Sequence, residues 1–302
     1  MKSLFWSGKL SPGVRLLVNS NNILALLAGN TRDKKAMKER VRLGYDGKFT
    51  DHVTRYDELS GYYQKRTAIA QTDGINFSGK KIIDIGCGTG IIAFLAMERG
   101  ASEAICGDIS DYMLERAKEN ALTIGYDLSR IKFHQLDAES LPFDNNSFDI
   151  VITGMSFGLF PDQVKAVNEM FRVLRPGGLV SLGAHGPEHY WEAIDTTIRS
   201  LSKRHLLGYR FEFWQRTEKQ IAGLMKDAGF KDIRTNRFIW RNFFENPVDA
   251  CEFFAAVSAN WWYAKIPEDK RNVEYENTRN YFRKKRIRII TDDVIIANAY
   301  KP

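Results

Sequence analysis

Three aspartates and a cluster of glycines are the residues whose types and spacing could do chemistry. Asp84 lies near the end of the apolar run 81–85, two residues before the first glycine of a loop with glycines at positions 86, 88 and 90. Glycine lets the backbone adopt positive φ and approach a ligand closely, and the helix expected next offers unpaired N–H groups to a carboxylate. The carboxylate of Asp84 suits an ammonium group and would repel a pyrophosphate. The loop therefore favours a ligand with an amine and a carboxylate over a dinucleotide, whose fingerprint also requires Gly or Ala where Ile91 stands.

The other two aspartates end the next two apolar runs. Asp108 lies 22 residues beyond Gly86, a spacing that fits an acid accepting hydrogen bonds from ribose hydroxyls. Asp137 can accept a hydrogen bond from an adenine amine. Because parallel strands bind ligands at their carboxyl ends, all three acids would face one ligand. An amino acid, a ribose and an adenine together describe S-adenosylmethionine. Each aspartate alone could instead be a helix N-cap.

The elements that must position these acids form an α/β pattern. Short apolar runs alternate with helix-like segments between residues 80 and 185, as in βαβ units around a parallel sheet. Helices are expected at about 89–99, 111–124 and 162–174, and 187–226 reads as helical. Strands are expected at residues 81–85, 104–108, 131–136, 148–153 and 179–184, with later candidates at 233–244 and 293–300.

Composition and charge exclude several classes of protein. The formal net charge is +7, and residues 1–50 carry all of this excess, with ten basic and three acidic side chains. This excludes a chain-wide nucleic-acid-binding face and predicts a basic helical leader. The cysteines at 87, 106 and 251 form no CxxC pattern, which disfavours structural zinc and suits a reducing compartment. No run approaches the roughly 20 apolar residues of a membrane span, so a cytoplasmic protein is expected.

These motifs resemble the class I S-adenosylmethionine-dependent methyltransferases. The chain is most similar to the group of quinone C-methyltransferases and small-molecule (methyltransferase type 11) enzymes. The resemblance covers residues from about 45 to 185, and the matching stretches are residues 83–90, 107–117, 137–143, 147–154 and 173–178.

The resemblance implies a fold, a cofactor and a domain division. The fold is a Rossmann-like, doubly wound, mostly parallel seven-stranded sheet with an antiparallel last strand. The cofactor is S-adenosyl-L-methionine, with S-adenosyl-L-homocysteine as product, and no metal. Residues 1–75 would form the leader that covers the cofactor. Residues 76–302 would form the methyltransferase domain, with a helical aromatic lid inserted at about 187–226 and 245–288.

The resemblance also implies cofactor-binding residues. Asp84 and the loop backbone would hold the methionyl end, and Asp108 the ribose. Ile109 and Met113 would pack on the adenine, Asp137 and Ala138 would read its edge, and the fourth strand would line the donor end. The full set is Tyr56, Asp84, Gly86, Cys87, Gly88, Gly90, Asp108, Ile109, Met113, Asp137, Ala138, Thr153 and Gly154.

The acceptor signals are aromatic side chains and two histidines. Phe157 and Phe160 stand where many relatives have a histidine pair, which suggests an apolar substrate wall. His185 and His189 follow the fifth strand and are candidate general bases, or structural loop histidines. Further aromatic residues favour a large apolar pocket, although such residues are often core; the substrate candidates among them are Trp191, Trp261 and Trp262.

The expected reaction is in-line methyl transfer to a small apolar or aromatic acceptor, quinone-like or lipid-like. One alternative is an RNA or protein methyltransferase that uses the leader and the basic side chains from Arg283 to Arg288. Against it, no Asn-Pro-Pro-Tyr-like motif follows the fourth strand. The other alternative is a non-catalytic module that binds S-adenosylmethionine. The leader could contact a membrane surface peripherally or a second copy of the chain; nucleic acid is not expected as a partner.

Overall fold

One sheet organises the structure, a computed structural model that describes residues 9–27, 34–46, 55–194, 216–259 and 268–302. In these residues seven strands lie in the order β3-β2-β1-β4-β5-β7-β6. The last strand in the chain, β7, pairs antiparallel with both of its neighbours, and the other pairings are parallel. This confirms the predicted fold class. The strands are β1 (Lys81–Ile85), β2 (Glu103–Asp108), β3 (Ile131–Gln135), β4 (Phe148–Thr153), β5 (Leu174–His185), β6 (Lys231–Phe243) and β7 (Ile289–Tyr300).

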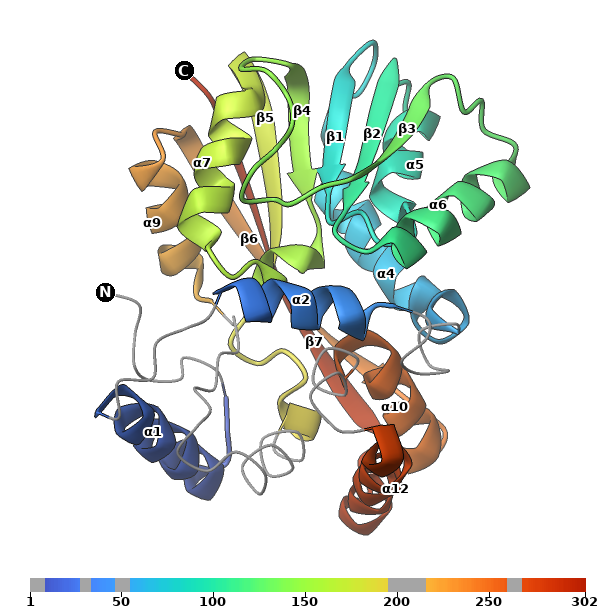
Figure 1. Cartoon of the computed structure of the whole chain (residues 1–302), viewed down its shortest axis with the longest axis vertical. Helices are drawn as coiled ribbons and strands as arrows, with labels where there is room; N and C mark the ends of the chain where they lie inside the picture. The colour runs from blue at the N-terminus through green and yellow to red at the C-terminus, as the bar shows by residue number, and fades with distance from the viewer. Residues whose placement is uncertain (1–8, 28–33, 47–54, 195–215, 260–267) are drawn as a thin grey trace.

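Helices cover the sheet on both faces, and β1 shows why. Ile83 and Ile85 belong to a buried cluster with residues of α7 (Gln163–Val173) and α9 (Glu218–Asp227). Ile82 belongs to a second cluster with residues of α5 (Ile91–Glu98) and α6 (Asp111–Ile124). Since successive side chains of a strand point to opposite faces, the buried isoleucines of β1 need helices on both sides of the sheet (Figure 1).

The predicted ends of strands and helices agree best with the structure where turn residues flank the element. β1, β4 and α6 begin and end as predicted, and α6 is capped by the Ser110 side chain and followed by Gly125 in the left-handed conformation. In contrast, β7 begins at Ile289, four residues earlier than predicted, because this stretch pairs with the end of β6. Of the predicted helical region 187–226, residues 191–194 are helical and α9 occupies its end, while 195–215 lie outside the described residues.

A third buried cluster lies beyond the carboxyl ends of the parallel strands. It joins α1 (Pro12–Leu27), α10 (Pro247–Phe254) and α12 (Glu268–Lys285). Val14 and Val18 of α1 pack there with Phe253, Phe254 and Phe282. The leader and the C-terminal aromatic region therefore share one core. No described helix is both long and apolar enough to cross a membrane.

The second leader helix, α2 (Lys34–Gly44), crosses the carboxyl edge of the sheet (Figure 1). It is held there by ion pairs. Nζ of Lys38 lies 2.5 Å from Oδ2 of Asp137 and 2.7 Å from Oε2 of Glu139, and Lys34 pairs with Asp162. The basic leader thus contacts acidic residues of the sheet edge. The division of the chain at residues 75 and 76, and the bounds of the lid, stay predictions.

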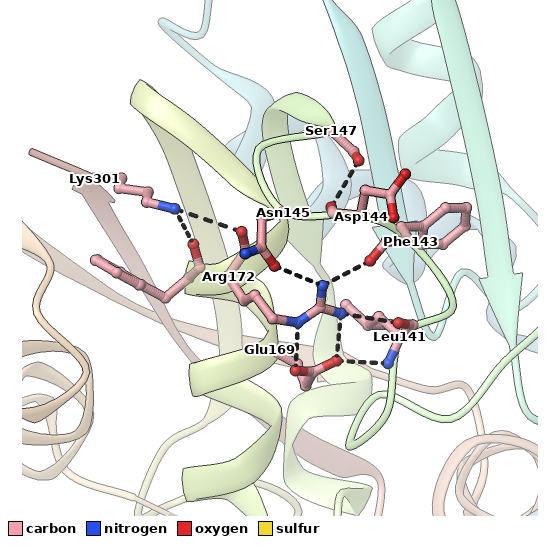
Figure 2. A network of polar contacts seen from close by, with 9 residues as sticks. Leu141, Phe143, Asp144, Asn145, Ser147, Glu169, Arg172 and Lys301 are labelled. Carbon is pink, nitrogen blue, oxygen red and sulfur yellow. Dashed lines mark hydrogen bonds and ion pairs between the residues drawn. The ribbon is translucent and has the colours of Figure 1, made fainter.

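The loop between β3 and β4, which carries Asp137, is fastened to α7 by one arginine (Figure 2). Arg172 donates to the carbonyl oxygens of Leu141 at 2.9 Å and Phe143 at 2.7 Å. It also pairs with Glu169, which accepts the N–H of Leu141 at 2.8 Å. These bonds satisfy loop backbone groups that lack secondary-structure partners and fix the position of the loop.

Candidate active site

A cavity of about 230 Å³ opens at the carboxyl edge of the sheet, beneath α2 and α4 (Tyr56–Thr72). One part, which we call the acidic end, contains Asp84, Asp108 and Asp137. The other part, which we call the aromatic end, is lined by Tyr63, His185, His189, Tyr190, Ile194, Phe254, Val257, Asp292 and Val294. The three acids predicted from strand ends therefore do meet at one cavity.

Asp84 is the most unusual group of the acidic end. Its side chain is 1% exposed, and neither carboxylate oxygen has a hydrogen-bond partner among the described residues. Burial raises the pKa of Asp84 to about 7, and the charge of Asp108 adds to the rise. A buried carboxylate without a partner is costly, so this site is built for a cationic group that the protein itself does not supply.

Asp108 is held in place by the glycine loop. Its Oδ2 accepts the N–H of Gly88 at 3.0 Å and its Oδ1 accepts the N–H of Ser110 at 2.9 Å. Burial raises the pKa of Asp108, while these N–H groups and that of Ile109 lower it. Each oxygen keeps a second lone pair, so the carboxylate can still accept from a ligand's hydroxyls.

The glycines of the loop allow the chain to bend close to the cavity. Gly86 has φ of 71°, and a Cβ there would collide with the Ser156 side chain. Gly90 has φ of 95° and caps the start of α5. Gly86, Cys87 and Gly88 line the cavity, as do Ile109, Met113, Ala138 and Gly154. Gly90 does not line the cavity, because the ring of Phe94 packs against it.

Tyr56, predicted to bind the cofactor, lines the cavity at the start of α4. Its neighbour Asp57 fastens this helix end: Oδ1 accepts from the Thr89 hydroxyl at 2.7 Å and Oδ2 from Nδ2 of Asn120 at 3.0 Å. The Tyr56 ring meets Tyr45 edge to face, with 6.5 Å between centroids. Burial raises the pKa of both phenols, so both remain protonated.

The two predicted histidines lie together at the aromatic end. Their ring centroids are 4.3 Å apart, and Nδ1 of His189 lies within 3.2 Å of the backbone of Asp293. Burial lowers the pKa of His185 to about 4; it also lowers that of His189, helped by the charge of His185. Both imidazoles are therefore neutral at physiological pH.

Asp293 supports the loop that carries these histidines. It is fully buried and accepts from Nε and Nη2 of Arg237 at 2.8 and 2.7 Å and from the N–H of Glu188 at 2.7 Å. Gly186 lets this carboxylate approach, because a Cβ there would collide with it. Asp293 and Arg237 thus position the histidines without lining the cavity themselves.

Asp292, the preceding residue of β7, points to the other face and lines the cavity. It accepts from Nη2 of Arg66 at 2.9 Å and from Nδ2 of Asn242 at 2.8 Å. Burial raises the pKa of Asp292 to about 6, and Asn242 and Arg66 oppose the rise. The charge at the aromatic end is consequently balanced within the protein.

Several predicted residues do not lie on the cavity wall. Phe157 lies in the short helix η1 (Met155–Leu159), which turns it into the buried core, whereas Phe160 does line the cavity. Thr153 is fully buried, with Oγ1 3.0 Å from Oγ of Ser156. Trp191 packs against the leader, with Nζ of Lys9 4.1 Å from its ring centroid. Trp261 and Trp262 lie outside the described residues.

Some lining residues that were not predicted carried a signal in the sequence, and others carried none. Lys38, Val41 and Tyr45 line the cavity at helical spacing i, i+3 and i+7, so an amphipathic pattern over residues 34–45 could have predicted them. Tyr190 and Asp292 carried no local signal, since their placement depends on the register of β7. Cys87 lines the cavity as a thiol, because a hydrogen bond with Cys106 and burial raise its pKa.

Comparison with known proteins places the chain in a family. A family model described as a methyltransferase domain matches residues 83–182. An uncharacterized protein of Mycobacterium tuberculosis is 30% identical over 169 residues, which are 56% of this chain and 60% of that protein's length. A demethylmenaquinone methyltransferase of Staphylococcus aureus is 35% identical over 233 residues, covering 68% of this chain and 91% of that protein.

Solved structures share the fold. The YcgJ protein of Bacillus subtilis has a TM-score of 0.51 at 19% identity, covering 81% of this chain and 98% of its own. The phosphoethanolamine N-methyltransferase 2 of Haemonchus contortus, in complex with S-adenosyl-L-methionine, has a TM-score of 0.53 at 22% identity, covering 84% and 57%. Such doubly wound sheets define a broad class of enzymes. This chain belongs to the class I S-adenosylmethionine-dependent methyltransferases.

The acidic end fits the cofactor of this family, S-adenosylmethionine. The unpartnered, buried Asp84 can take its ammonium group, and the glycine loop has room for its methionyl backbone. Asp108 keeps lone pairs for the ribose hydroxyls, and Ile109 and Met113 offer apolar surface for the adenine. The individual roles of these residues stay predictions.

Proposed function

We propose that the protein transfers the methyl group of S-adenosylmethionine to a small, uncharged apolar or aromatic acceptor that binds at the aromatic end. The observation that carries the proposal is the character of that end. Its described wall is largely aromatic and aliphatic, its histidines are neutral, and its acid is already paired with Arg66. The name of the staphylococcal relatives, demethylmenaquinone methyltransferase, supports a quinone-like acceptor. A lipid-like acceptor would suit the same apolar wall.

The charges of the lining argue against a phosphorylated acceptor of the kind named for the Haemonchus enzyme. Lys38 is the one lysine or arginine among the described lining residues, and Asp137 and Glu139 already bind it. A buried phosphate without a cationic partner would be strongly destabilised. An uncharged acceptor meets no such cost here.

His185 is the residue we propose as general base. When bound, S-adenosylmethionine supplies a methyl group already activated on a sulfonium. A base is needed only where the acceptor atom loses a proton, and the neutral His185 ring faces the cavity and can accept one. His189, fixed by the Asp293 backbone, is the second candidate and packs beside it. Replacing His185 by Gln should lower kcat and leave cofactor affinity unchanged.

Methyl transfer from labelled S-adenosylmethionine into a fractionated extract of the source organism tests the proposal. Label in organic-soluble material would support it. The Asp108→Ala protein, which should lose the cofactor, controls for labelling by contaminants.

A second candidate function has one structural observation in its favour. The basic side chains near the end of α12, namely Arg283, Lys284, Lys285, Arg286 and Arg288, are exposed, as a contact with RNA or an acidic protein would need. Label in the RNA or protein fraction would support this alternative. Label in no fraction would favour a non-catalytic module that binds S-adenosylmethionine.

We also propose a peripheral contact for α1. Its Leu16 and Leu27 are 70% and 77% exposed, on a helix whose other side is buried. Such a surface suits a membrane interface, or a second copy of the chain. Co-sedimentation with anionic vesicles and sedimentation velocity would distinguish the two.

A further inference from the structure

We propose that Gln71 of α4 binds the cofactor by accepting a hydrogen bond from its ammonium group, as a second acceptor beside Asp84. Gln71 lines the cavity and is fully buried, and no motif of the sequence marks it. Its proposed role concerns the cofactor alone and does not depend on which acceptor binds at the aromatic end.

The amide group of Gln71 has a defined orientation. Its Nε2 lies 2.9 Å from the carbonyl oxygen of Thr153 and 3.2 Å from that of Ser181. Because carbonyl oxygens only accept hydrogen bonds, the NH2 group must face them and Oε1 must point elsewhere. That oxygen is buried and has no hydrogen-bond partner among the described residues. Burying a polar atom without a partner is costly, so we expect a ligand to supply the donor.

Gln71 and Asp84 meet the same face of the sheet. Ile82 packs with residues of α5, and since side chains alternate along a strand, Asp84 points to that face too. Asp84 pairs with Ile152 of β4, which pairs with Ser181 of β5, and Nε2 of Gln71 lies 3.3 Å from Oγ of Ser181. Adjacent strands lie about 4.8 Å apart, so the two unpartnered acceptors are separated by a single strand.

Two glycines keep the space beside the amide oxygen open. A Cβ at Gly183 would lie 2.8 Å from Oε1 of Gln71 and 3.2 Å from the carbonyl carbon of Gly154. Oε1 is therefore close to Gly154, which lines the cavity together with Gln71, Asp84 and Ile92. A Cβ at Gly154 would in turn lie 3.0 Å from Cδ1 of Ile92. Side chains at these two positions would fill the space that adjoins both acceptors.

An ammonium group is the donor that fits this pair of acceptors. It has three N–H groups and a positive charge, so one N–H can bind the carboxylate of Asp84 and another the neutral amide oxygen of Gln71. A hydroxyl has one hydrogen and no charge, and it would leave one of the two acceptors unsatisfied. S-adenosylmethionine presents such an ammonium group at its methionyl end, whereas its sulfonium sulfur has no hydrogen to donate.

Calorimetry with two probes tests this role without turnover. The probes are S-adenosylhomocysteine and its deamino analogue, in which hydrogen replaces the amino group. Gln71→Leu removes the acceptor and keeps a side chain of similar size. It should weaken the binding of S-adenosylhomocysteine about tenfold more than the binding of the analogue.

Gln135→Leu is the matched control for this comparison. Gln135 is an exposed glutamine that also donates to a backbone carbonyl, that of Ile109, but it does not line the cavity. Its replacement should leave the ratio of the two affinities unchanged.

Gly183→Ala is a second test, in which Gln71 itself is kept. Gly183 lies within β5, a strand, where alanine can adopt the backbone conformation. The new methyl group would lie 2.8 Å from Oε1 of Gln71 and must displace it. The affinity for S-adenosylhomocysteine should fall severalfold relative to that for the analogue.

The ratio of the two affinities separates a contact with the ammonium group from support of the sheet. If Gln71→Leu weakens both probes alike, Gln71 only supports the sheet and the proposed contact is overturned. If Gln71→Leu does not fold, Gly183→Ala decides, and an unchanged ratio overturns the contact. Equal binding of the two probes by the wild type would overturn it as well. Methyl transfer into organic-soluble material is measured separately, so the proposed function stands or fails independently of these results.

Discussion

The two ends of the cavity treat buried acids in opposite ways. At the acidic end, Asp84 has no hydrogen-bond partner among the described residues, and its pKa is raised to about 7. At the aromatic end, Asp292 is bound by an arginine and an asparagine. The difference teaches where charge is expected from a ligand: the acidic end requires a cation from outside, and the aromatic end does not.

The largest expected effect concerns Asp108, which should be needed for the cofactor alone. Asp108→Ala removes an acceptor for two ribose hydroxyls, each bond to a charged group contributing about 1.5–3 kcal/mol. We expect cofactor affinity to fall at least about a hundredfold, measured by calorimetry. Asp111→Ala, which changes an exposed acid three residues away, is the control. Unchanged binding by Asp108→Ala would refute the assignment of the acidic end.

The Asp84→Asn variant tests whether the acidic end requires a cationic group from the ligand. Asp84→Asn keeps the shape of the side chain and removes its charge, so cofactor affinity should fall about thirtyfold at alkaline pH. In the wild type, Asp84 becomes protonated as pH falls through about 7, and a protonated acid cannot balance an ammonium. Cofactor affinity should therefore decline below pH 7 in the wild type and show no such decline in Asp84→Asn.

The same raised pKa has a consequence for stability without cofactor. The folded chain holds the Asp84 proton more tightly than the unfolded chain, whose pKa is near 3.8. Stability should then decline as pH rises from about 4 to 7, and Asp84→Asn should be more stable than the wild type at neutral pH. A less stable Asp84→Asn protein would contradict the view that this acid is unsatisfied until cofactor binds.

At the aromatic end, removing a charged side chain should destabilise the protein, in contrast to Asp84→Asn. Arg66→Ala leaves Asp292 buried with its charge unbalanced, so the free energy of unfolding should fall by about 2 kcal/mol, less than for a fully buried pair because Arg66 is partly exposed. Urea denaturation measures this, with the exposed Lys65→Ala as control. Cofactor affinity should not change; a large loss of it would remove the distinction between the two ends.

The smallest expected effect concerns the leader. Lys38→Met removes the ion pairs with Asp137 and Glu139 that hold α2 over the acidic end. We expect cofactor affinity to change severalfold and to lose part of its salt dependence, because partly exposed pairs contribute about 1 kcal/mol or less. Lys35→Met, an exposed lysine of the same helix, should change neither. Equal behaviour of the two variants would show that α2 does not depend on this contact.

Sequence could predict what local patterns determine. The strand patterns of β1 and β2, the glycine loop and the caps of α6 are local, and they place Asp84 and Asp108 near strand ends. Tertiary contacts determine the rest. The helix η1 is too short to show a hydrophobic periodicity in the sequence. The orientation of Phe157 toward the core therefore could not be predicted. Asp292 was missed because β7 is antiparallel, so its beginning meets the cavity, and that beginning depends on pairing with β6.

The neighbouring Asp292 and Asp293 have a consequence for strand register. They point to opposite faces of β7, and each binds its own arginine, Arg66 or Arg237. A slip of β7 by one residue in one direction would put Val294 in the place of Asp293, beside Arg237. A slip in the other direction would put Thr291 in the place of Asp292, beside Arg66. Either slip leaves an arginine without its anion, which disfavours the alternative pairing. The tandem acids thereby specify one alignment of β7 in the sheet while shaping the site.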